Sequence, residues 1–336
     1  MDVGKPPNEI LATLLARVQR RDPRVVLGPG IGRDAAVIDH GGPKLLVAKS
    51  DPITFATDLI GRYAVHVNAN DIACLGARPA WFLATILLPD GASPDLAETI
   101  FDQILETCEA LDIELVGGHT EVTFRLDRPI VVGSLLGEVE RDALVTPDGA
   151  RPGDALLLAK GIAIEGTAVL AHEAAHGLAG LGVPSEVIER AAQYLLDPGI
   201  SAVREAMAAC QAVRVHAMHD PTEGGLATAL YEMAEAAGLG IAVRAGKIDV
   251  LPETRILCER TGLDPMGLLA SGALLLAVAA PDTEPALEAI RGTGAAASRI
   301  GSLVPAAQGV IMEVNDRQRP VPRFSQDEVA RFLSQG

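Results

Sequence analysis

A run of turn-forming residues near the middle of the chain constrains its fold more than any other feature. Residues 146–153 read Thr-Pro-Asp-Gly-Ala-Arg-Pro-Gly, and a stretch so rich in proline, glycine and aspartate ends the helices and strands on either side of it. The chain has 336 residues, which is longer than one typical hydrophobic core supports. The sequence therefore predicts two domains, residues 1–150 and residues 151–336.

Helical and extended patterns follow one another in both halves, because apolar residues recur at helical spacing or cluster in short runs between turn formers. The predicted helices are residues 8–20, 59–75, 95–111, 165–175, 184–196, 199–211, 224–237 and 326–333. The predicted strands are residues 35–39, 44–49, 81–88, 113–116, 130–139, 155–160, 241–245 and 273–280. A turn at residues 41–43 joins the first two strands as a hairpin, which a purely parallel sheet does not contain. We expect α/β domains with mixed (α+β) sheets.

Composition excludes several classes of protein. A formal net charge of -16 argues against holding nucleic acid or an anionic membrane through a general field, so a bound phosphate needs backbone amides, a helix start or a metal ion. Aromatic residues make up 3% of the chain, too few for base-stacking platforms. The cysteines form no CxxC pair, which favours reduced core thiols over a zinc or redox site. There is no secretory signal and no apolar run of the ~20 residues that cross a bilayer, so we expect a cytoplasmic protein.

Two short runs in the first half place carboxylates where a metal ion could bind. Asp51 follows the apolar strand at residues 44–49, and Pro52 is predicted to stop this strand and leave Asp51 in a loop. Asn70 and Asp71 lie inside a predicted helix, although both are poor helix formers. A hard cation with oxygen ligands gives this pair a reason to be there. The structural alternative is a capping Asp51 and a hydrogen-bonded Asn70-Asp71 pair.

The run His-Asp-Pro-Thr-Glu-Gly-Gly-Leu-Ala at residues 219–227 is the most specific one. Asp220 precedes a proline, which favours an extended backbone, Thr222 is placed to cap a helix, and Gly224 stands where that helix opens. The run predicts an anion-binding helix start beside an acidic ligand. A well-capped helix is the structural alternative, but it leaves Asp220 and the paired glycines without a common purpose.

A glycine-rich segment, with Gly28, Gly30 and Gly32, adds candidate phosphate contacts. It lies between a predicted helix and a predicted strand, which is the wrong order for a dinucleotide-binding fingerprint. Its amides suit a segment that closes over phosphates, and a plain connector is the alternative. Asp34 follows as a metal ligand or a turn residue.

A second segment, Gly117-Gly118-His119-Thr120, follows the strand predicted at residues 113–116. Its glycines permit close backbone approach, and its polar side chains can contact a phosphate or a metal. His119 is a candidate ligand, phosphate donor or proton-transfer group, and a hydrogen-bonded loop histidine is the structural alternative.

These runs, in this order, resemble the aminoimidazole ribonucleotide synthetase (PurM-like) superfamily of ATP-binding proteins. The matching segments are GIGRDAAV (30–37), KSDP (49–52), NANDIACLGARP (68–79), GGHTEV (117–122), RPGDALLLAKGI (151–162) and HDPTEGGLA (219–227). They span most of the chain. The DPTxGGLA pattern is similar to that of the hydrogenase expression/formation (HypE) branch.

The resemblance implies a homodimer in which an N-terminal α/β domain dimerises, a C-terminal α/β domain follows, and ATP binds between the two domains. It implies that Mg²⁺ and the triphosphate are bound by Asp34, Asp51, Asp71 and Asp220. Further nucleotide contacts are expected from Gly30, Gly32, Asn70, Gly117, Gly118, Thr120, Thr222 and Gly224. The candidate catalytic residues are His119 and Asp220.

The resemblance also implies an enzyme. In this superfamily ATP phosphorylates an amide-type or carbonyl-type oxygen and so turns it into a leaving group, and the hydrogenase branch dehydrates a thiocarboxamide to a thiocyanate in this way. Positioning and charge neutralisation suffice for such a transfer, so no serine or cysteine nucleophile is required. We expect a Mg²⁺-dependent enzyme that phosphorylates a small acceptor or one carried by a protein partner.

Two positions depart from the hydrogenase branch. That branch presents its substrate on a C-terminal cysteine, whereas the last cysteine here is Cys258, and it has aspartate where His119 stands. The acceptor therefore stays open at this point. The alternatives are a thiamine-phosphate kinase, an aminoimidazole ribonucleotide synthetase, a regulatory protein that binds ATP without catalysis, and a metal-dependent phosphoesterase.

Overall fold

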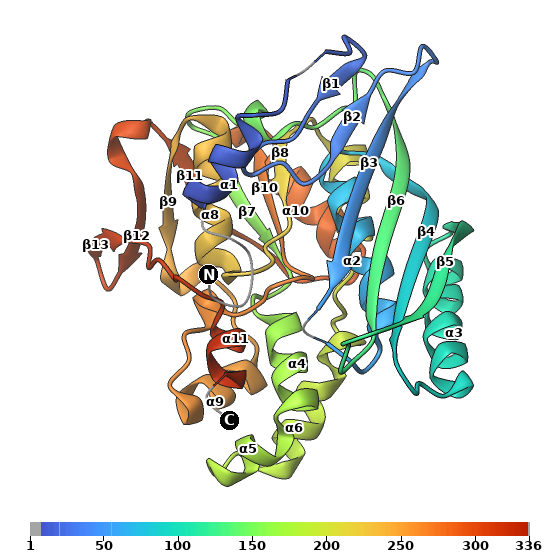
Figure 1. The fold of residues 1–336 in the computed structure, drawn as a ribbon. Helices are drawn as coiled ribbons and strands as arrows, with labels where there is room; N and C mark the ends of the chain where they lie inside the picture. The colour runs from blue at the N-terminus through green and yellow to red at the C-terminus, as the bar shows by residue number, and fades with distance from the viewer. Residues whose placement is uncertain (1–7, 20, 55, 335–336) are drawn as a thin grey trace. The chain divides into compact units, whose positions relative to one another are not determined.

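The computed structural model describes residues 8–19, 21–54 and 56–334, which belong to two compact units (Figure 1). Unit 1 comprises residues 1–19, 29–33 and 145–336, and unit 2 comprises residues 20–28 and 34–144. Two short N-terminal segments thus belong with the C-terminal half of the chain, which no local pattern in the sequence indicates. The domain boundary at residue 150 stays a prediction.

Unit 2 is a six-stranded mixed sheet with two helices. Its elements are β1 (Val25–Leu27), β2 (Ala36–Ile38), β3 (Lys44–Ile53), α2 (Ile60–Cys74), β4 (Arg78–Pro89), α3 (Pro94–Ala110), β5 (Glu114–Thr123) and β6 (Ile130–Glu140). The strand order is β1-β2-β3-β6-β4-β5. Strands β4 and β5 are parallel and the other neighbours are antiparallel, so the mixed sheet expected from the early hairpin is confirmed.

The two helices of unit 2 have different surroundings. Helix α3 begins after Ser93, whose hydroxyl accepts a hydrogen bond from the Leu96 amide at 3.2 Å, and buries Ile100, Ile104 and Cys108 at helical spacing. Helix α2 packs against β3, β4, β6 and α3, and nearly all of its residues are buried. Polar residues of α2 are therefore enclosed and need partners inside the unit.

Strand β3 is longer than the sequence predicts. It continues through Pro52 to Ile53, and Asp51 and Pro52 pair with Gly133 and Val132 of β6. The prediction that Pro52 leaves Asp51 in a loop is wrong, because pairing with the long strand β6 overrides the local stop signal. The Asp51 carboxylate is therefore held by a strand.

Strand β5 also differs from the prediction of a loop after Val116. It runs on to Thr123 and pairs with β4, so Gly117 and Gly118 lie inside a strand. A Cβ atom at Gly118 would overlap the backbone of Ala84 on β4, so close sheet packing explains this glycine. Because β5 is the edge strand, its residues are largely exposed.

Unit 1 contains a seven-stranded mixed sheet with the order β13-β12-β9-β11-β7-β10-β8. Its strands are β7 (Ala155–Ala159), β8 (Val215–His219), β9 (Gly240–Arg244), β10 (Leu274–Val278), β11 (Ala297–Val304), β12 (Val310–Val314) and β13 (Arg317–Pro320). Strands β7 and β10 are buried at every residue, as continuous apolar runs predict for central strands.

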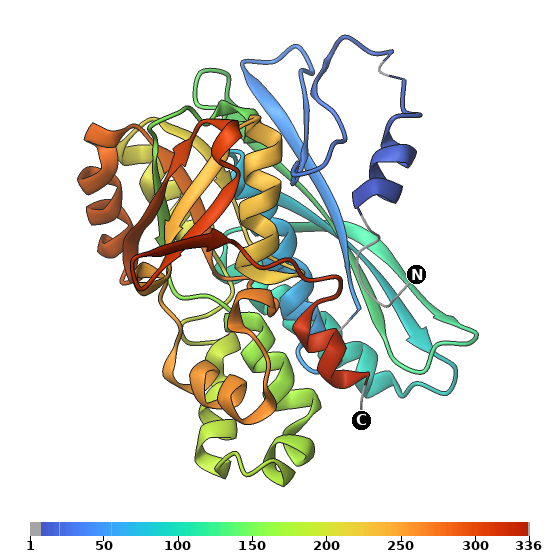
Figure 2. The ribbon, with the colours of Figure 1, turned by 90° about the vertical axis from the view of Figure 1, so that its left-hand side faces the viewer.

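Some helices of unit 1 pack on this sheet, whereas others pack with one another beyond the strand ends (Figure 1). The helices are α1 (Asn8–Leu15), α4 (Ile164–Glu173), α5 (Ala175–Gly180), α6 (Ser185–Ala192), α7 (Val203–Ala212), α8 (Gly225–Ala237), α9 (Pro252–Thr261), α10 (Thr283–Gly292) and α11 (Glu328–Leu333). Those that pack with one another are α4, α5, α6, α9 and α11. Short 3-10 turns are η1 (Pro147–Gly149), η2 (Gln193–Leu195), η3 (Ala245–Lys247), η4 (Pro265–Gly267), η5 (Ala280–Asp282) and η6 (Ala306–Gln308). Helix α8 packs against β9 and β12, and α7 and α10 lie on the opposite face (Figure 2). Among the described residues, no helix is both long and apolar enough to span a bilayer.

Several elements differ from the sequence-based expectation. Helix α1 ends at Leu15 instead of residue 20, and the sequence does not predict α9 or β11 to β13. Helix α9 is largely polar and β13 is wholly exposed, so neither shows a clear apolar period. The expectation of core thiols is confirmed for Cys74, Cys108 and Cys258, which are free and buried.

Candidate functional site

A lysine and two aspartates meet in unit 2. Lys49 and Asp51 lie on β3, and Asp71 lies on α2. The Nζ atom of Lys49 is 3.1 Å from Oδ2 of Asp51 and 2.9 Å from Oδ2 of Asp71. The Asp71 side chain is 5% exposed, that of Lys49 18% and that of Asp51 37%. Two predicted metal ligands thus converge on one cation, and we call these three residues the carboxylate cluster.

Asn68 of α2 fixes the backbone of Asp51. The Asp51 amide donates to Oδ1 of Asn68 at 2.9 Å, and Nδ2 of Asn68 donates to the carbonyl oxygens of Asp51 at 3.3 Å and Ala64 at 2.8 Å. The Asn68 side chain thus binds the backbone amide and carbonyl of Asp51, which are the groups that a neighbouring strand would otherwise bind. Gly133 of β6 allows the close approach, because a Cβ atom there would overlap Nδ2 of Asn68.

The charges around Lys49 act together. Burial by itself would lower the pKa of Lys49, but the charges of Asp71, Asp51 and Asp34 and the hydrogen bond to Asp71 raise it above its ordinary value. The lysine therefore stays charged at neutral pH. Asp34, just before β2, shares this electrostatic environment, and Asn70 is fully buried on α2. Unit 2 thus brings Asp51 and Asp71 into contact with one cation, and the charge of Asp34 acts on the same lysine.

Helix α8 of unit 1 opens with two glycines in left-handed conformations, with φ of 76° at Gly224 and 63° at Gly225. A Cβ atom at Gly225 would lie 2.5 Å and 2.6 Å from the carbonyl oxygens of Met266 and Leu268. The Gly225 amide donates to the carbonyl of Thr222 at 3.0 Å, and the N-cap residue of this helix is Gly224, which has no side chain. The prediction that Thr222 caps α8 is wrong, because the backbone closes this turn.

A carboxylate already lies at the start of α8. The amide of Gly224 donates to Oδ2 of Asp327 at 2.7 Å, although Asp327 lies 103 residues further along the chain. The other oxygen of Asp327 accepts from the Val329 amide at 2.8 Å. The helix start therefore already holds a carboxyl group, and a phosphate bound to Gly224 would have to replace this hydrogen bond.

Two buried carboxyl groups of unit 1 have perturbed acidity. The pKa values of Glu165 and Asp327 are raised to about 7, mainly by burial. The charge of Glu223 contributes to both increases, while the amides of Gly224 and Val329 at Asp327 act in the opposite direction. Groups that gain or lose a proton near neutral pH are candidates for proton transfer.

The glycine-rich segment of unit 1 lies against α8. Gly32 has φ of 67°, and a Cβ atom there would lie 2.9 Å from the carbonyl oxygen of Glu232. A Cβ atom at Gly30 would lie 2.7 Å from the side chain of Arg33. Strand β1, which the sequence does not predict, lies between the predicted first helix and this segment, and β2 follows the segment. The dinucleotide-binding fingerprint is therefore absent, because it needs a following helix.

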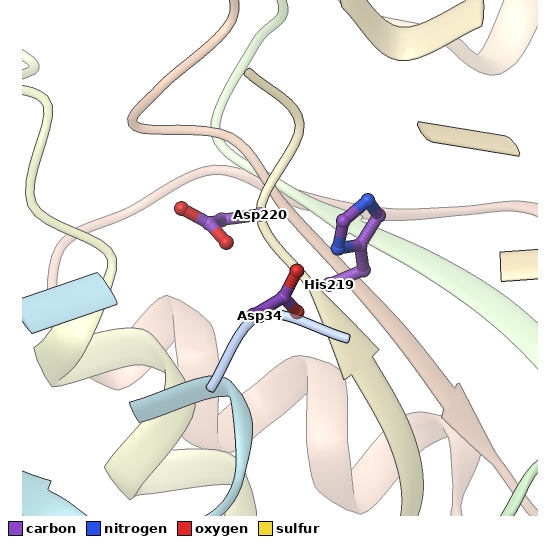
Figure 3. A group of neighbouring side chains, drawn as sticks. All are labelled: Asp34, His219 and Asp220. Carbon is purple, nitrogen blue, oxygen red and sulfur yellow. The ribbon is translucent and has the colours of Figure 1, made fainter. Parts of the chain in front are cut away.

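The end of β8 presents His219 and Asp220 (Figure 3). Asp220 is buried, with 1% of its surface exposed. Nε2 of His219 lies 3.1 Å from Oε2 of Glu232 on α8, which ties the end of the strand to this helix. Asp34, also drawn in Figure 3, belongs to unit 2.

The remaining candidates lie on β5, away from the carboxylate cluster. His119 is 64% exposed, and its Nε2 atom lies 3.0 Å from Oε2 of Glu121. Gly117, Gly118 and Thr120 are exposed on the same strand. Strands β4 and β6 separate β5 from β3, so unit 2 does not bring these residues to Lys49. Their roles stay predictions.

Sequence reasoning missed three residues that organise the site: Lys49, Asn68 and Asp327. Asn68 precedes Asp71 by three residues, so their position on one helix face was a usable signal. Lys49 stands two residues before Asp51 and so points to the same side of the strand. Asp327 carries no such signal, because its contact with Gly224 joins distant parts of the chain.

Comparison with known families then decides the assignment. Residues 32–139 match the model of the AIR synthase related protein N-terminal domain, and residues 151–313 match that of the AIR synthase related protein C-terminal domain. The chain belongs to the AIR synthase related family. The resemblance noted in the sequence and the mixed α/β PurM-like architecture are both confirmed.

Hydrogenase maturation proteins are among the similar AIR synthase related proteins. The chain is 32% identical over 279 residues to carbamoyl dehydratase HypE of Cupriavidus necator, covering 80% of this chain and 76% of the relative. It is 31% identical over 315 residues to hydrogenase expression/formation protein HupE of Azotobacter chroococcum, covering 91% and 87%. The similarity to the hydrogenase expression/formation branch is therefore confirmed.

Solved AIR synthase related structures share the fold. HypE in complex with ATP has a TM-score of 0.69 at 26% identity, covering 90% of this chain and 92% of that one. A chain of a HypE–HypF complex has a TM-score of 0.75 at 23% identity, covering 94% and 99%. Thiamine monophosphate kinase from Aquifex aeolicus has a TM-score of 0.67 at 20% identity, covering 91% and 94%.

Proposed function

We propose that the chain is a Mg²⁺-dependent enzyme that binds ATP and transfers phosphate to an amide-type or carbonyl-type oxygen in hydrogenase maturation. The carboxylate cluster carries the proposal, because Asp51 and Asp71 converge from β3 and α2 on a single cation. The similarity to a protein named carbamoyl dehydratase HypE and to a HypE solved with ATP supports the nucleotide and the class of reaction. Use of ATP also favours a cytoplasmic location.

The donor set suits Mg²⁺, which prefers carboxylate oxygens. An ammonium group already stands between Asp51 and Asp71, so the packing of unit 2 accommodates a positive charge there. We assign Asp34, Asp51, Asp71 and Asp220 as metal ligands. When bound, Mg²⁺ would neutralise charge on the phosphates and so favour transfer.

We assign the phosphate contacts of unit 1 to backbone amides and one hydroxyl. The amides of Gly30 and Gly32 and the hydroxyl of Thr222 are donors, and Gly224 becomes one when Asp327 releases its amide. In unit 2 we assign a nucleotide contact to Asn70, whose amide side chain is buried. As a metal ligand, Asp220 would help to place the charge that neutralises the reacting phosphate.

We propose a carbamoyl-type group on a protein partner as the acceptor, which the HypE–HypF complex of a relative supports. Attack of the amide oxygen on the terminal phosphorus forms an O–P bond and releases ADP. Loss of phosphate then breaks the C–O bond, and the nitrogen gives up its two protons to leave a nitrile. His119, exposed on β5, is the proposed acceptor of one of these protons.

Calorimetric titration with ATP, with and without Mg²⁺, tests the proposal. We expect ATP to bind with Mg²⁺ and at least ~tenfold more weakly with a chelator, because the carboxylates repel an unneutralised triphosphate. ADP formation should require a carbamoylated protein partner. Failure to bind ATP would contradict the proposal, and tight binding without ADP formation for any acceptor would favour the regulatory alternative.

We also propose a homodimer in which a second copy of the chain covers β5. This edge strand exposes Val116 and Val122, and Phe124 beside it is 86% exposed, which is an apolar edge that soluble proteins usually cover. Three strand spacings, about 14 Å, separate His119 from the carboxylate cluster of its own chain. We therefore propose that the carboxylate cluster is approached by His119 of the second copy. Sedimentation equilibrium should give twice the 34.9 kDa chain mass, and a monomer would contradict the proposal.

A further inference from the structure

We propose that Lys49 is a built-in counter-ion that takes the place of the divalent metal in the carboxylate cluster, so that a metal ion must displace its ammonium group before it can bind. The inference rests on the proposed function, in which Asp51 and Asp71 are metal ligands. It adds a residue that controls when the metal binds. In this arrangement the chain by itself binds divalent ions weakly.

The geometry sets the ammonium and a metal ion in competition. Nζ of Lys49 contacts Oδ2 of Asp51 at 3.1 Å and Oδ2 of Asp71 at 2.9 Å, and carboxylate oxygens are the atoms a divalent ion would bind. A metal ion at ~2.1 Å from those oxygens would stand almost on the ammonium group. Two positive centres this close repel each other, and the repulsion is strong where water is scarce.

Burial makes this lysine different from an ordinary surface ion pair. The side chains of Lys49 and Asp71 are 18% and 5% exposed, so solvent screens their interaction little. Lys44, on the same strand, also faces two carboxylates, with Nζ 3.3 Å from Glu138 and 3.9 Å from Glu140, but its side chain is 42% exposed. Lys44 is therefore a matched control, because it is also a lysine beside two carboxylates but it is exposed to water.

Displacement of Lys49 would also link the metal to the nucleotide. Once the carboxylates hold a metal ion, the ammonium group loses its two partners and needs another anion, because an unpaired charge in a partly buried site is costly. A phosphate bound to that metal supplies one at short range. Metal and nucleotide should therefore bind cooperatively, with Lys49 moving from the carboxylates to the phosphate.

Titration with Mn²⁺ in the absence of nucleotide tests the inference. Lys49→Gln removes the competing charge and should bind Mn²⁺ at least ~tenfold more tightly than the unmodified chain, as measured by the paramagnetic resonance of free Mn²⁺. Lys44→Gln should bind Mn²⁺ as the unmodified chain does. Lys49→Gln should at the same time lose affinity for ATP in the presence of metal.

A second variant keeps the test decisive if Lys49→Gln does not fold. Lys49→Arg retains the positive charge and should bind Mn²⁺ as weakly as the unmodified chain, whereas Lys49→Met should gain affinity. Equal Mn²⁺ affinity in the neutral variants and the unmodified chain would overturn the inference, and Mg²⁺-dependent ATP binding by the unmodified chain would show that the proposed function survives. Absence of metal and ATP binding in every form would overturn both.

Discussion

Replacing Asp71 with asparagine should abolish Mg²⁺-ATP binding at nucleotide concentrations that saturate the unmodified chain. Asparagine keeps the shape of the side chain but removes the charge that a divalent ion needs. We expect the dissociation constant for ATP with Mg²⁺ to rise at least ~100-fold, which is about 2.7 kcal/mol. Loss of one charged hydrogen-bond partner has effects of this order. Isothermal calorimetry measures the change directly.

The fold should tolerate this substitution. Lys49 keeps Asp51 as a partner at 3.1 Å, so the free energy of unfolding should fall by about 1–2 kcal/mol, less than the ~3–5 kcal/mol expected when a buried charge loses its only partner. Asp90→Asn, at an exposed aspartate just after β4, should change neither ATP affinity nor stability. Full ATP affinity in Asp71→Asn, or its failure to fold, would mean that Asp71 serves the fold instead of a metal ion.

Gly225→Ala should destabilise unit 1 by at least ~3 kcal/mol, because two costs add at this residue. Its φ of 63° lies in the left-handed region, which costs a residue with a Cβ atom about 1 kcal/mol. The new methyl group would also lie 2.5 Å and 2.6 Å from two backbone carbonyl oxygens, neither of which can move aside as a side chain can. Urea unfolding should show this loss as a lower midpoint.

Gly224→Ala is the matched comparison. Gly224 has a similar φ of 76°, and the nearest atoms to an added Cβ belong to the side chain of Thr228, not to backbone carbonyl groups. The Thr228 hydroxyl can rotate away, but its Cβ atom at 2.9 Å must shift with the helix. The cost should therefore be about 2 kcal/mol, smaller than at Gly225, with about 1 kcal/mol from the left-handed backbone and the rest from repacking against Thr228. If both alanine variants lose the same stability, the carbonyl contacts at Gly225 do not explain the paired glycines.

The features predicted correctly from the sequence are those that depend on local patterns. Apolar spacing along α2, α3 and α8 and the turn between β2 and β3 indicate a mixed α/β chain, because periodicity and turn chemistry act over a few residues. The polar Asn70 and Asp71 stand out for the same reason, since they interrupt an apolar helix pattern. The failures at Pro52 and after Val116 lie where pairing with a long neighbouring strand outweighs a local stop signal.

By itself the sequence determined the mixed α/β architecture, the family and the carboxylates to examine. Only the tertiary structure decided that Asp51 and Asp71 share one ammonium group, that Gly225 faces two carbonyl oxygens, and that Asp327 reaches the start of α8. Each of these contacts joins residues from separate elements. No local pattern encodes such a contact, because it exists only after the sheet and helices have packed and brought distant side chains to the same place.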